Sequence, residues 1–177
     1  AIGQEGTSFG LVDGDTLFVQ TNLGAPNGRV DAYDLRSKAA GGAWKPQTVV
    51  AERPGMAIQS ISLARGLLAV DYLKNATSVI EVFDASAGSA IFAAGALSGT
   101  PAKSLGELAM PGIGSAGLAT ESDRTEAYLK FTSFNYPTTI FRVDLGRPAL
   151  EPELWERPPV PVDPSTVEVK QVWYSSK

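Results

Sequence analysis

Three stretches of this chain share one pattern, and their spacing constrains the fold more than any other feature. Residues 17–34, 67–84 and 127–144 form windows of 18 residues that align without a gap. Each window ends in Asp and has a β-branched residue four positions before it. The windows start at residues 17, 67 and 127, so they lie 50 and 60 residues apart. A repeat of this length is typical of propeller blades and solenoid units, which stack against their neighbours.

Each window predicts a strand, a turn and a second strand. The arms are rich in β-branched and aromatic residues, and the turns carry Asn, Gly or Pro. A third strand is predicted before each hairpin, over residues 7–12, 58–64 and 113–119. A fourth strand is predicted after each hairpin, over residues 48–51, 104–110 and 153–156. The sequence therefore predicts an all-β chain of three four-stranded antiparallel β-propeller blades, at about residues 1–52, 53–110 and 111–157.

Composition excludes several classes of partner. The chain has 177 residues, of which 44% are hydrophobic and 19% are charged, as in ordinary globular proteins. The net charge is -4 and no basic run is present, so we expect no nucleic-acid partner. No stretch approaches the roughly 20 apolar residues of a membrane span, so we expect no membrane partner.

The sequence contains no Cys and no His. Disulfides, thiolate metal sites and a Cys nucleophile are therefore excluded within this chain. The usual general base is also missing, so a Ser-His-Asp mechanism cannot be assembled from these residues alone. We therefore assign no catalytic, cofactor-binding or metal-binding residue, and we expect no cofactor. On this reading the chain alone is not an enzyme.

A dinucleotide-type fingerprint occurs over residues 112–117, with glycines at 112, 114 and 117. That motif binds a pyrophosphate only where it opens a helix. Here it leads into a predicted strand, so an inner blade strand is the favoured interpretation.

Two short motifs have turn interpretations. Asn75-Ala76-Thr77 is a glycosylation acceptor sequence, but it also fits a hairpin turn. Asp13-Gly14-Asp15 resembles part of a calcium loop but lacks its spaced oxygens, and a turn between strands explains it.

Two sets of carboxylates have both catalytic and structural interpretations. A carboxylate at the same place in each repeat favours bonds to turn amides over catalysis, and this set contains Asp34, Asp84 and Asp144. The second set surrounds a Leu-Trp pair and contains Glu151, Glu153 and Glu156. Paired carboxylates can perform glycosidase chemistry, but a position on the solvated rim of the propeller is the favoured interpretation.

Three aromatic residues of the third repeat could stack on a ligand. They are Phe131, Phe134 and Tyr136. Their place in the repeat favours packing between blades instead.

The character of the sequence changes after Glu156. Four prolines fall between residues 158 and 164, which stiffens the chain and removes donors for strand pairing. Residues 167–174 then alternate between apolar and polar, as a strand does. We interpret residues 158–166 as an inter-domain linker and 167–177 as the first strand leading into another domain.

Four stretches, in the same order, resemble the prolyl oligopeptidase family of serine peptidases. Residues 131–145 resemble the family's last blade, and residues 21–30 and 72–78 resemble two of its earlier hairpins. Residues 167–177 resemble its entry into the peptidase domain. Residues 86–102 match no part of the family pattern and suggest an insertion.

The resemblance implies that these are the closing three blades of a seven-bladed propeller. In the family, the propeller caps an α/β-hydrolase domain that holds the catalytic triad and cleaves short peptides after proline. The implied partners are that hydrolase domain, in the same protein, and short proline-containing peptides. The expected location is the cytoplasm, with the periplasm as the alternative. No catalytic residue of the family falls on a position of this chain.

Three alternatives remain open at this point. The propeller could belong to a related peptidase, such as oligopeptidase B or acylaminoacyl peptidase. It could be a stand-alone binding or scaffold module, in which case residues 167–174 should pair with an existing blade. A third alternative is a glycan-processing propeller that uses Glu151, Glu153 or Glu156.

Overall fold

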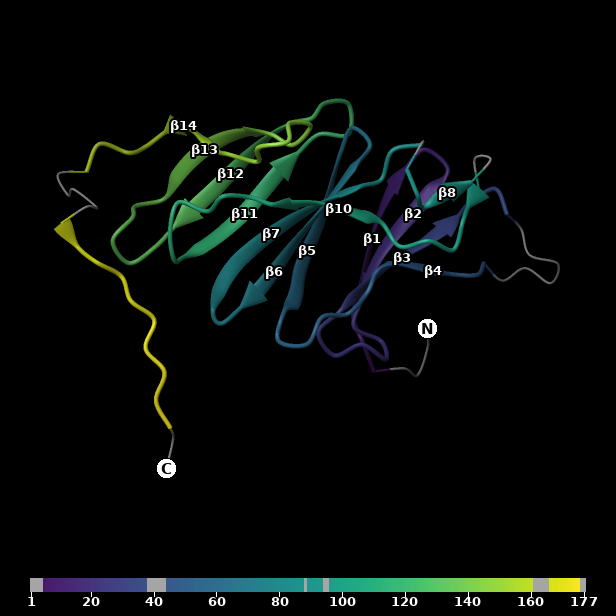
Figure 1. The fold of residues 1–177 in the computed structure, drawn as a ribbon, viewed down its shortest axis with the longest axis horizontal. Coiled ribbons are helices and arrows are strands. Elements are labelled where there is room, and N and C mark those ends of the chain that lie inside the picture. The colour runs from purple at the N-terminus through teal and green to yellow at the C-terminus, as the bar shows by residue number, and fades with distance from the viewer. Residues whose placement is uncertain (1–4, 38–43, 88, 94–95, 161–165, 176–177) are drawn as a thin grey trace.

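A computed structural model describes residues 5–37, 44–87, 89–93, 96–160 and 166–175. Three four-stranded antiparallel sheets, which we call blades 1, 2 and 3, follow one another along the chain (Figure 1). Blade 1 contains β1 (Ser8–Asp13), β2 (Thr16–Thr21), β3 (Arg29–Asp34) and β4 (Gln47–Val50). Blade 2 contains β5 (Ala57–Ala64), β6 (Leu67–Lys74), β7 (Thr77–Asp84) and β10 (Lys103–Glu107). Blade 3 contains β11 (Ser115–Thr120), β12 (Glu126–Thr132), β13 (Thr139–Asp144) and β14 (Glu153–Glu156). The predicted fold class and blade composition are confirmed.

The predicted insertion lies between β7 and β10. It contains a small hairpin, β8 (Phe92–Ala93) and β9 (Ala96–Leu97), which packs near blade 1. Ile91 is fully buried in the core that blades 1 and 2 share. Gln47 and the backbone of Gly99 and Thr100 exchange hydrogen bonds of 2.8 and 3.0 Å. The insertion therefore fastens blade 2 onto the outer strand of blade 1.

Two hydrophobic cores lie between the blades. The first joins blades 1 and 2 and contains Phe18, Val30, Leu68 and Val70. The second joins blades 2 and 3 and includes Val82, Leu129 and Phe131 among its buried members. Each strand alternates between its two faces, so blade 2 contributes alternate residues to each core. Blade-to-blade packing therefore holds the described part of the chain together.

The strand register reveals a one-residue difference in blade 2. In a gapless alignment of the three windows Leu17, Leu67 and Ala127 are equivalent. Leu17 lies opposite Tyr33 and Ala127 opposite Val143, but the residue opposite Phe83 is Leu68. Relative to blades 1 and 3, the first arm of the blade 2 hairpin is therefore displaced by one residue. The cause is that the hairpin of blade 2 is one residue shorter. This matters because a one-residue slip moves every side chain of a strand to the other face.

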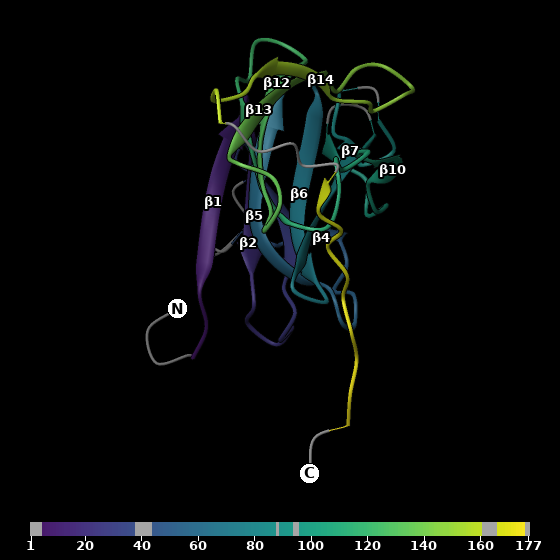
Figure 2. The ribbon, with the colours of Figure 1, turned by 90° about the vertical axis from the view of Figure 1, so that its left-hand side faces the viewer.

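The strand predicted over residues 167–174 is not formed. Residues 168–175 have irregular structure and pair with no strand of the described chain. Two side-chain contacts accompany this segment: Asn135 Nδ2 donates to Val167 O at 2.7 Å, and Gln171 Nε2 donates to Asn75 O. Figure 2 shows it (yellow) extending away from the sheets. A strand needs a hydrogen-bonding neighbour, and this segment has none among the described residues.

Part of the predicted linker lies outside the described residues, namely 161–165, as do residues 176–177 at the end of the predicted strand. None of the described segments is a helix of the length and hydropathy required for a membrane span.

Candidate functional site

The first strands of the three blades, β1, β5 and β11, form one surface, which we call the axial surface. β5 contacts both β1 and β11. A Cβ added to Gly10 in β1 would lie 3.0 Å from Leu17 Cδ1 in β2, so this glycine allows close packing within blade 1. The interpretation that small side chains mark inner strands at a crowded axis stays a prediction.

The axial surface has two ends of different polarity. At one end, a cavity of about 400 Å³ is lined by hydroxyl and amide side chains together with Phe9. At the other end, a cavity of about 410 Å³ is lined by residues of all three inner strands, among them Leu11, Ile61 and Leu118. The residues that line both cavities are uncharged. The lining of these two cavities therefore offers no charged group for acid-base chemistry.

The recurrent Asp residues make the same contact in each blade. The Oδ1 atoms of Asp34, Asp84 and Asp144 accept the backbone N–H two residues later, at 2.9, 3.0 and 3.0 Å. Hydrogen bonds from the Arg36 side chain and amide lower the pKa of Asp34. The Thr125 hydroxyl and the Gly146 amide lower the pKa of Asp144. The structural interpretation of these carboxylates as turn caps is confirmed.

The glycine motif over residues 112–117 opens a strand and not a helix. β11 begins at Ser115, within the motif. A Cβ on Gly114 would lie 2.3 Å from Thr132 O and 2.7 Å from Phe131 Cζ, so only glycine fits there. The interpretation as an inner blade strand is confirmed, and the helix N-terminus that a dinucleotide site needs is not formed here.

Both short turn motifs occupy tight turns. Asn75 and Ala76 have φ of 51° and 58° and form the two-residue turn of the β6–β7 hairpin. Gly14, at φ 54°, lies in the turn that joins β1 to β2. The turn interpretations are confirmed.

The three glutamates are exposed on the outer edge of blade 3, as the sequence interpretation favoured. Glu153 is held by Arg142, with 3.1 Å between Arg142 Nη2 and Glu153 Oε2. Arg142 also lies 5.6 Å from the centroid of the Trp155 ring. Glu153 thus forms part of a surface cluster of charged and aromatic side chains, and an exposed carboxylate of this kind is solvated.

The three aromatic residues differ from one another. Phe131 is buried in the core between blades 2 and 3, and Tyr136 packs edge-on against it at 5.6 Å between ring centroids. Phe134 is fully exposed, so the prediction that it packs between blades is wrong. It lies in the loop between β12 and β13, where the alternation of a strand no longer determines its direction.

Two charged residues at the seams between blades were not singled out from the sequence. Glu81 in β7 is buried and pairs with Arg53, which lies in the connection from blade 1. Asp71 in β6 is also buried, its Oδ1 has no hydrogen-bond partner, and burial raises its pKa to about 6. The only sequence signal was a charged residue in an otherwise apolar strand. Among the described residues, no group of three or more His, Cys, Asp or Glu side chains could hold a metal ion.

The chain resembles known proteins along nearly its whole length. Residues 5–153 match the family model described as the N-terminal beta-propeller domain of prolyl oligopeptidase. A prolyl endopeptidase of Elizabethkingia miricola is 30% identical over 96% of this chain and 21% of its own length. A prolyl endopeptidase of Elizabethkingia meningoseptica is 26% identical over 93% of this chain and 20% of its own. The chain thus spans about a fifth of the length of these relatives.

Solved structures agree with the fold. One structure comes from a study of two prolyl endopeptidases and the role of inter-domain dynamics. It is 31% identical to this chain, with a TM-score of 0.75, and the match covers 99% of this chain and 23% of the solved chain. Prolyl oligopeptidase B from Galerina marginata is 22% identical over 97% of this chain and 22% of its own, with a TM-score of 0.72, and supports the fold alone. Given the blades described above, this chain belongs to the N-terminal β-propeller domain family of the prolyl oligopeptidases.

Proposed function

We propose that this chain is the propeller part of a prolyl oligopeptidase-type serine peptidase and acts as its cap and size filter. The match of residues 5–153 to the family's propeller carries the proposal. The peptide bond after proline would be cleaved in an α/β-hydrolase domain of the same protein, because this chain has no His to serve as the general base.

The axial surface supports the filter role. Its two cavities have volumes of about 400 and 410 Å³ and uncharged linings, and they lie along the inner strands of adjacent blades. The uncharged lining would make no charge-specific contact with a peptide that passes along it. The proposed substrates are short proline-containing peptides, on the match to the family's propeller.

The path of residues 166–175 favours this function over a stand-alone binding module. A strand that closes a stand-alone propeller should pair with a blade, but this segment contacts blades 2 and 3 through the side chains of Gln171 and Asn135. Because no strand pairing joins residues 166–175 to a blade in the described chain, this path supports a chain that leaves the propeller for another domain. We further propose a cytoplasmic location, with the periplasm as the alternative; cell fractionation tests it.

A chimera tests the function. In the prolyl endopeptidase of Elizabethkingia miricola, the matched fifth would be replaced by this chain, and cleavage of a short and a long proline-containing peptide would be compared. We expect the chimera to keep the preference for the short peptide, and an enzyme lacking the segment to lose it. The isolated chain should not hydrolyse a chromogenic Gly-Pro substrate. Equal cleavage of both peptides by a folded chimera would contradict the filter role.

A further inference from the structure

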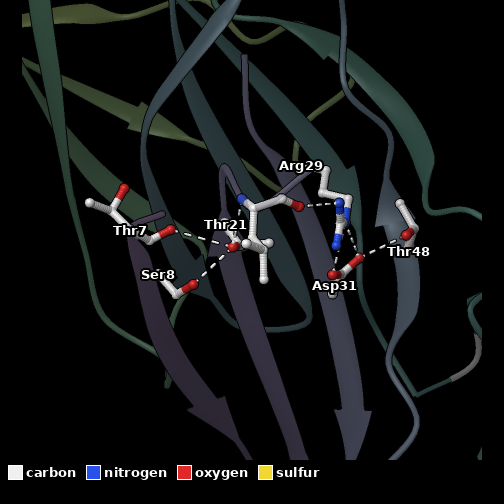
Figure 3. Close-up of polar contacts among 7 residues, drawn as sticks. Thr7, Ser8, Thr21, Arg29, Asp31 and Thr48 are labelled. Atoms are coloured by element: carbon white, nitrogen blue, oxygen red, sulfur yellow. Dashed lines mark hydrogen bonds and ion pairs between the residues drawn. The ribbon is translucent and has the colours of Figure 1, made fainter. Parts of the chain in front are cut away.

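Three carboxylates are buried in the described strands, and two of them have partners. Asp31 in β3 lies between a cation and a hydroxyl: Arg29 Nε is 2.9 Å from its Oδ2, and Thr48 Oγ1 donates to its Oδ1 at 2.7 Å (Figure 3). Glu81 in β7 has the same two kinds of partner. Asp71 in β6 is 9% exposed, and its Oδ1 accepts no hydrogen bond from the described residues. A buried carboxylate without a partner is costly, so the position of Asp71 calls for an explanation.

Asp71 faces blade 3. Alternation along β6 places its side chain on the same side as Leu67 and Ala69, which belong to the core between blades 2 and 3. β11, the first strand of blade 3, contacts both β5 and β7 and so runs along this side of blade 2. Asp71 is therefore buried at the seam between the two blades.

The backbone of Ala116 in β11 lies close to this point of the seam. The Ala116 amide donates to Ser78 Oγ at 3.0 Å, and Ser78 Oγ lies 3.4 Å from Ala116 O. Ser78 in β7 comes two residues before Ile80, which is the residue opposite Asp71. Residues two apart along a strand share one face, so Asp71 and Ser78 belong to the same patch of blade 2, next to Ala116.

The seam between blades 1 and 2 has a polar contact at the equivalent position. Gln20 Nε2 donates to Ile58 O at 3.3 Å, from β2 of blade 1 to β5 of blade 2. Gln20 is the third residue after Leu17. Asp71 is the third residue after Leu68, which has the register position of Leu17. Asp71 therefore occupies in blade 2 the place that Gln20 occupies in blade 1.

The acceptor in that contact has an equivalent in blade 3. Ile58 lies opposite Tyr72 in blade 2. Ala116 lies opposite Phe131, which holds the register position of Tyr72 in blade 3. The N–H groups of Ile58 and Ala116 both bond to the hairpin of the preceding blade. The Ala116 carbonyl is therefore the acceptor for Asp71 that corresponds to Ile58 O.

The two seams differ in the donor. The Gln20 amide can donate at any pH, whereas an Asp carboxyl can donate only when it is protonated. An ionised Asp71 would direct a negative charge at the Ala116 carbonyl oxygen in a buried site, which is unfavourable. Asp is one methylene shorter than Gln, so the contact also requires blades 2 and 3 to lie close together here. The hydrogen bonds between Ser78 and Ala116 hold them close.

Blade 3 presents no charged side chain to Asp71 from its described strands. In β11, β12 and β13, the side chains toward blade 2 are uncharged, and most of them belong to the core between the blades. Lys130 and Arg142 alternate with these core residues and point to the other side. Asp71 therefore has no cation across the seam with which to form an ion pair.

The charged side chains on the Asp71 side of the strands of blade 2 are distant. Asp84 and Lys103 lie opposite each other on this side, at the far end of the strands. Asp84 is four residues along β7 from the residue opposite Asp71, which corresponds to about 13 Å. Beyond blade 3, Glu168 and Lys170 bind each other at 2.9 Å. Burial is accordingly what raises the pKa of Asp71 to about 6.

We propose that Asp71 is a proton-dependent latch between blades 2 and 3. Its carboxyl takes up a proton from solvent and donates it in a hydrogen bond to the Ala116 carbonyl, and this bond is lost when the proton returns to solvent. The latch thus closes the seam in acid and loosens it at neutral pH. It is independent of the proposed peptidase function, because both groups belong to this chain.

A titration followed by NMR tests the contact directly. The carboxyl carbon of Asp71 and the carbonyl carbon of Ala116 would be observed in the chain from pH 4 to pH 8. We expect both signals to move with one midpoint, at about pH 6. The carbonyl carbon of Ile58 should stay constant, because the amide of Gln20 does not titrate. A titrating Asp71 beside an unmoved Ala116 signal would overturn the proposal.

The variant Asp71→Asn isolates the proton, because its amide can donate at any pH. In this variant the Ala116 carbonyl signal should stay constant from pH 4 to pH 8. Asp31→Asn is the matched control, since it changes a buried acid that has partners, and there the Ala116 signal should titrate as in the wild type. An Ala116 titration that persists in Asp71→Asn would count against the latch, because another group would then be its source.

Amide hydrogen exchange tests whether the seam itself loosens. The Ala116 amide, bonded to Ser78, reports on the seam between blades 2 and 3. The Ile58 amide, bonded to Asn27 O at 2.7 Å, reports on the seam between blades 1 and 2. Between pH 4.5 and pH 7.5 the protection factor of the Ala116 amide should fall on the order of tenfold relative to that of Ile58. Equal falls at both amides would also overturn the proposal, because Asp71 would then act on the whole chain and not on one seam.

Discussion

Arg53 binds Glu81 through both ends of its guanidinium, with 2.5 Å from Nη1 to Oε2 and 3.2 Å from Nη2 to Oε1. Arg53 comes from the connection between blades 1 and 2, whereas Glu81 lies inside β7. The guanidinium carbon also lies 5.5 Å from the centroid of the Tyr72 ring. One arginine thus fastens the connection to the face of blade 2 that packs on blade 1.

Removal of Arg53 should destabilise this seam. Arg53→Met leaves the Glu81 carboxylate buried without its cation, which should lower the free energy of unfolding by about 2 kcal/mol. The cost stays below that of a fully buried pair because the Arg53 side chain is 37% exposed. Urea denaturation of Arg53→Met, of Glu81→Met and of the double variant measures it.

The double variant should lose less than the sum of the two single variants, because it removes both charges. The control is Arg142→Met, whose partner Glu153 has a side chain that is 67% exposed. We expect that variant to lose little or no stability, because solvent screens an exposed pair. Strict additivity at Arg53 and Glu81 would show that the pair does not couple the connection to the blade.

The stability of the chain should depend on Asp71 between pH 4 and pH 7. Burial raises the pKa of Asp71 to about 6 in the folded chain, so the folded state holds this proton more tightly than the unfolded state. The stability from this proton is fully present below the unfolded pKa and is lost as the pH rises through about 6. Asp71→Asn should therefore be more stable than the wild type at pH 7.5, by about 2 kcal/mol, and nearly equal to it at pH 4.

Asp144→Asn provides the opposite case. Hydrogen bonds from Thr125 and Gly146 lower the pKa of Asp144, so its contribution is present above the unfolded pKa and is lost as the pH falls below it. This variant should lose stability at pH 7.5 and approach the wild type in acid. Thermal melts of both variants and of the wild type from pH 3 to pH 8 should show opposite changes at pH 7.5: a higher Tm for Asp71→Asn and a lower Tm for Asp144→Asn. Parallel pH profiles for Asp71→Asn and the wild type would refute the role of Asp71.

The blades could be predicted from the sequence, but the exact register of blade 2 could not. Alternation and turn residues located the strands, and the fourth strand of blade 3 was predicted at its observed bounds, Glu153–Glu156. The turn at Asn75 has the same Asn-containing character as the other two turns, so a gapless alignment gave no sign that it is one residue shorter. Only the cross-strand pairs, such as Leu68 with Phe83, reveal it.

One other prediction failed and one stays untested, because both depended on neighbours that the sequence does not name. Residues 167–174 alternate as a strand does, but alternation describes two faces and does not supply a hydrogen-bonding partner. Phe134 shares its repeat with buried aromatic residues, yet it lies in the loop after β12. The buried Asp71 and Glu81 were missed because a charged residue in a strand usually faces solvent, and only the packing of the blades decides otherwise.

The turn of the β6–β7 hairpin should accept glycine with a gain in stability. Ala76 has φ of 58°, a left-handed conformation that costs a residue with a Cβ about 1–2 kcal/mol. Ala76→Gly removes this cost but gives the unfolded chain more freedom, so we expect a net gain of about 0.5–1 kcal/mol. Asn75→Gly should gain less, because Asn tolerates this conformation. Thermal melts compare the two variants, and a loss of stability in Ala76→Gly would contradict the expectation.

Two glycines of the same motif should respond in opposite ways to alanine. At Gly114 a Cβ would lie 2.3 Å from Thr132 O and 2.7 Å from Phe131 Cζ, so the strand must shift at a backbone atom and a buried ring. At Gly117 a Cβ would meet nothing within 4 Å. Gly114→Ala should therefore lose about 2–3 kcal/mol or more through overpacking. Gly117→Ala should be neutral or slightly stabilising, because it reduces the freedom of the unfolded chain. Urea denaturation of the two variants measures the difference. Equal losses would mean that the motif is kept for its backbone flexibility, whereas the expected contrast would assign Gly114 to the close approach of β11 to β12.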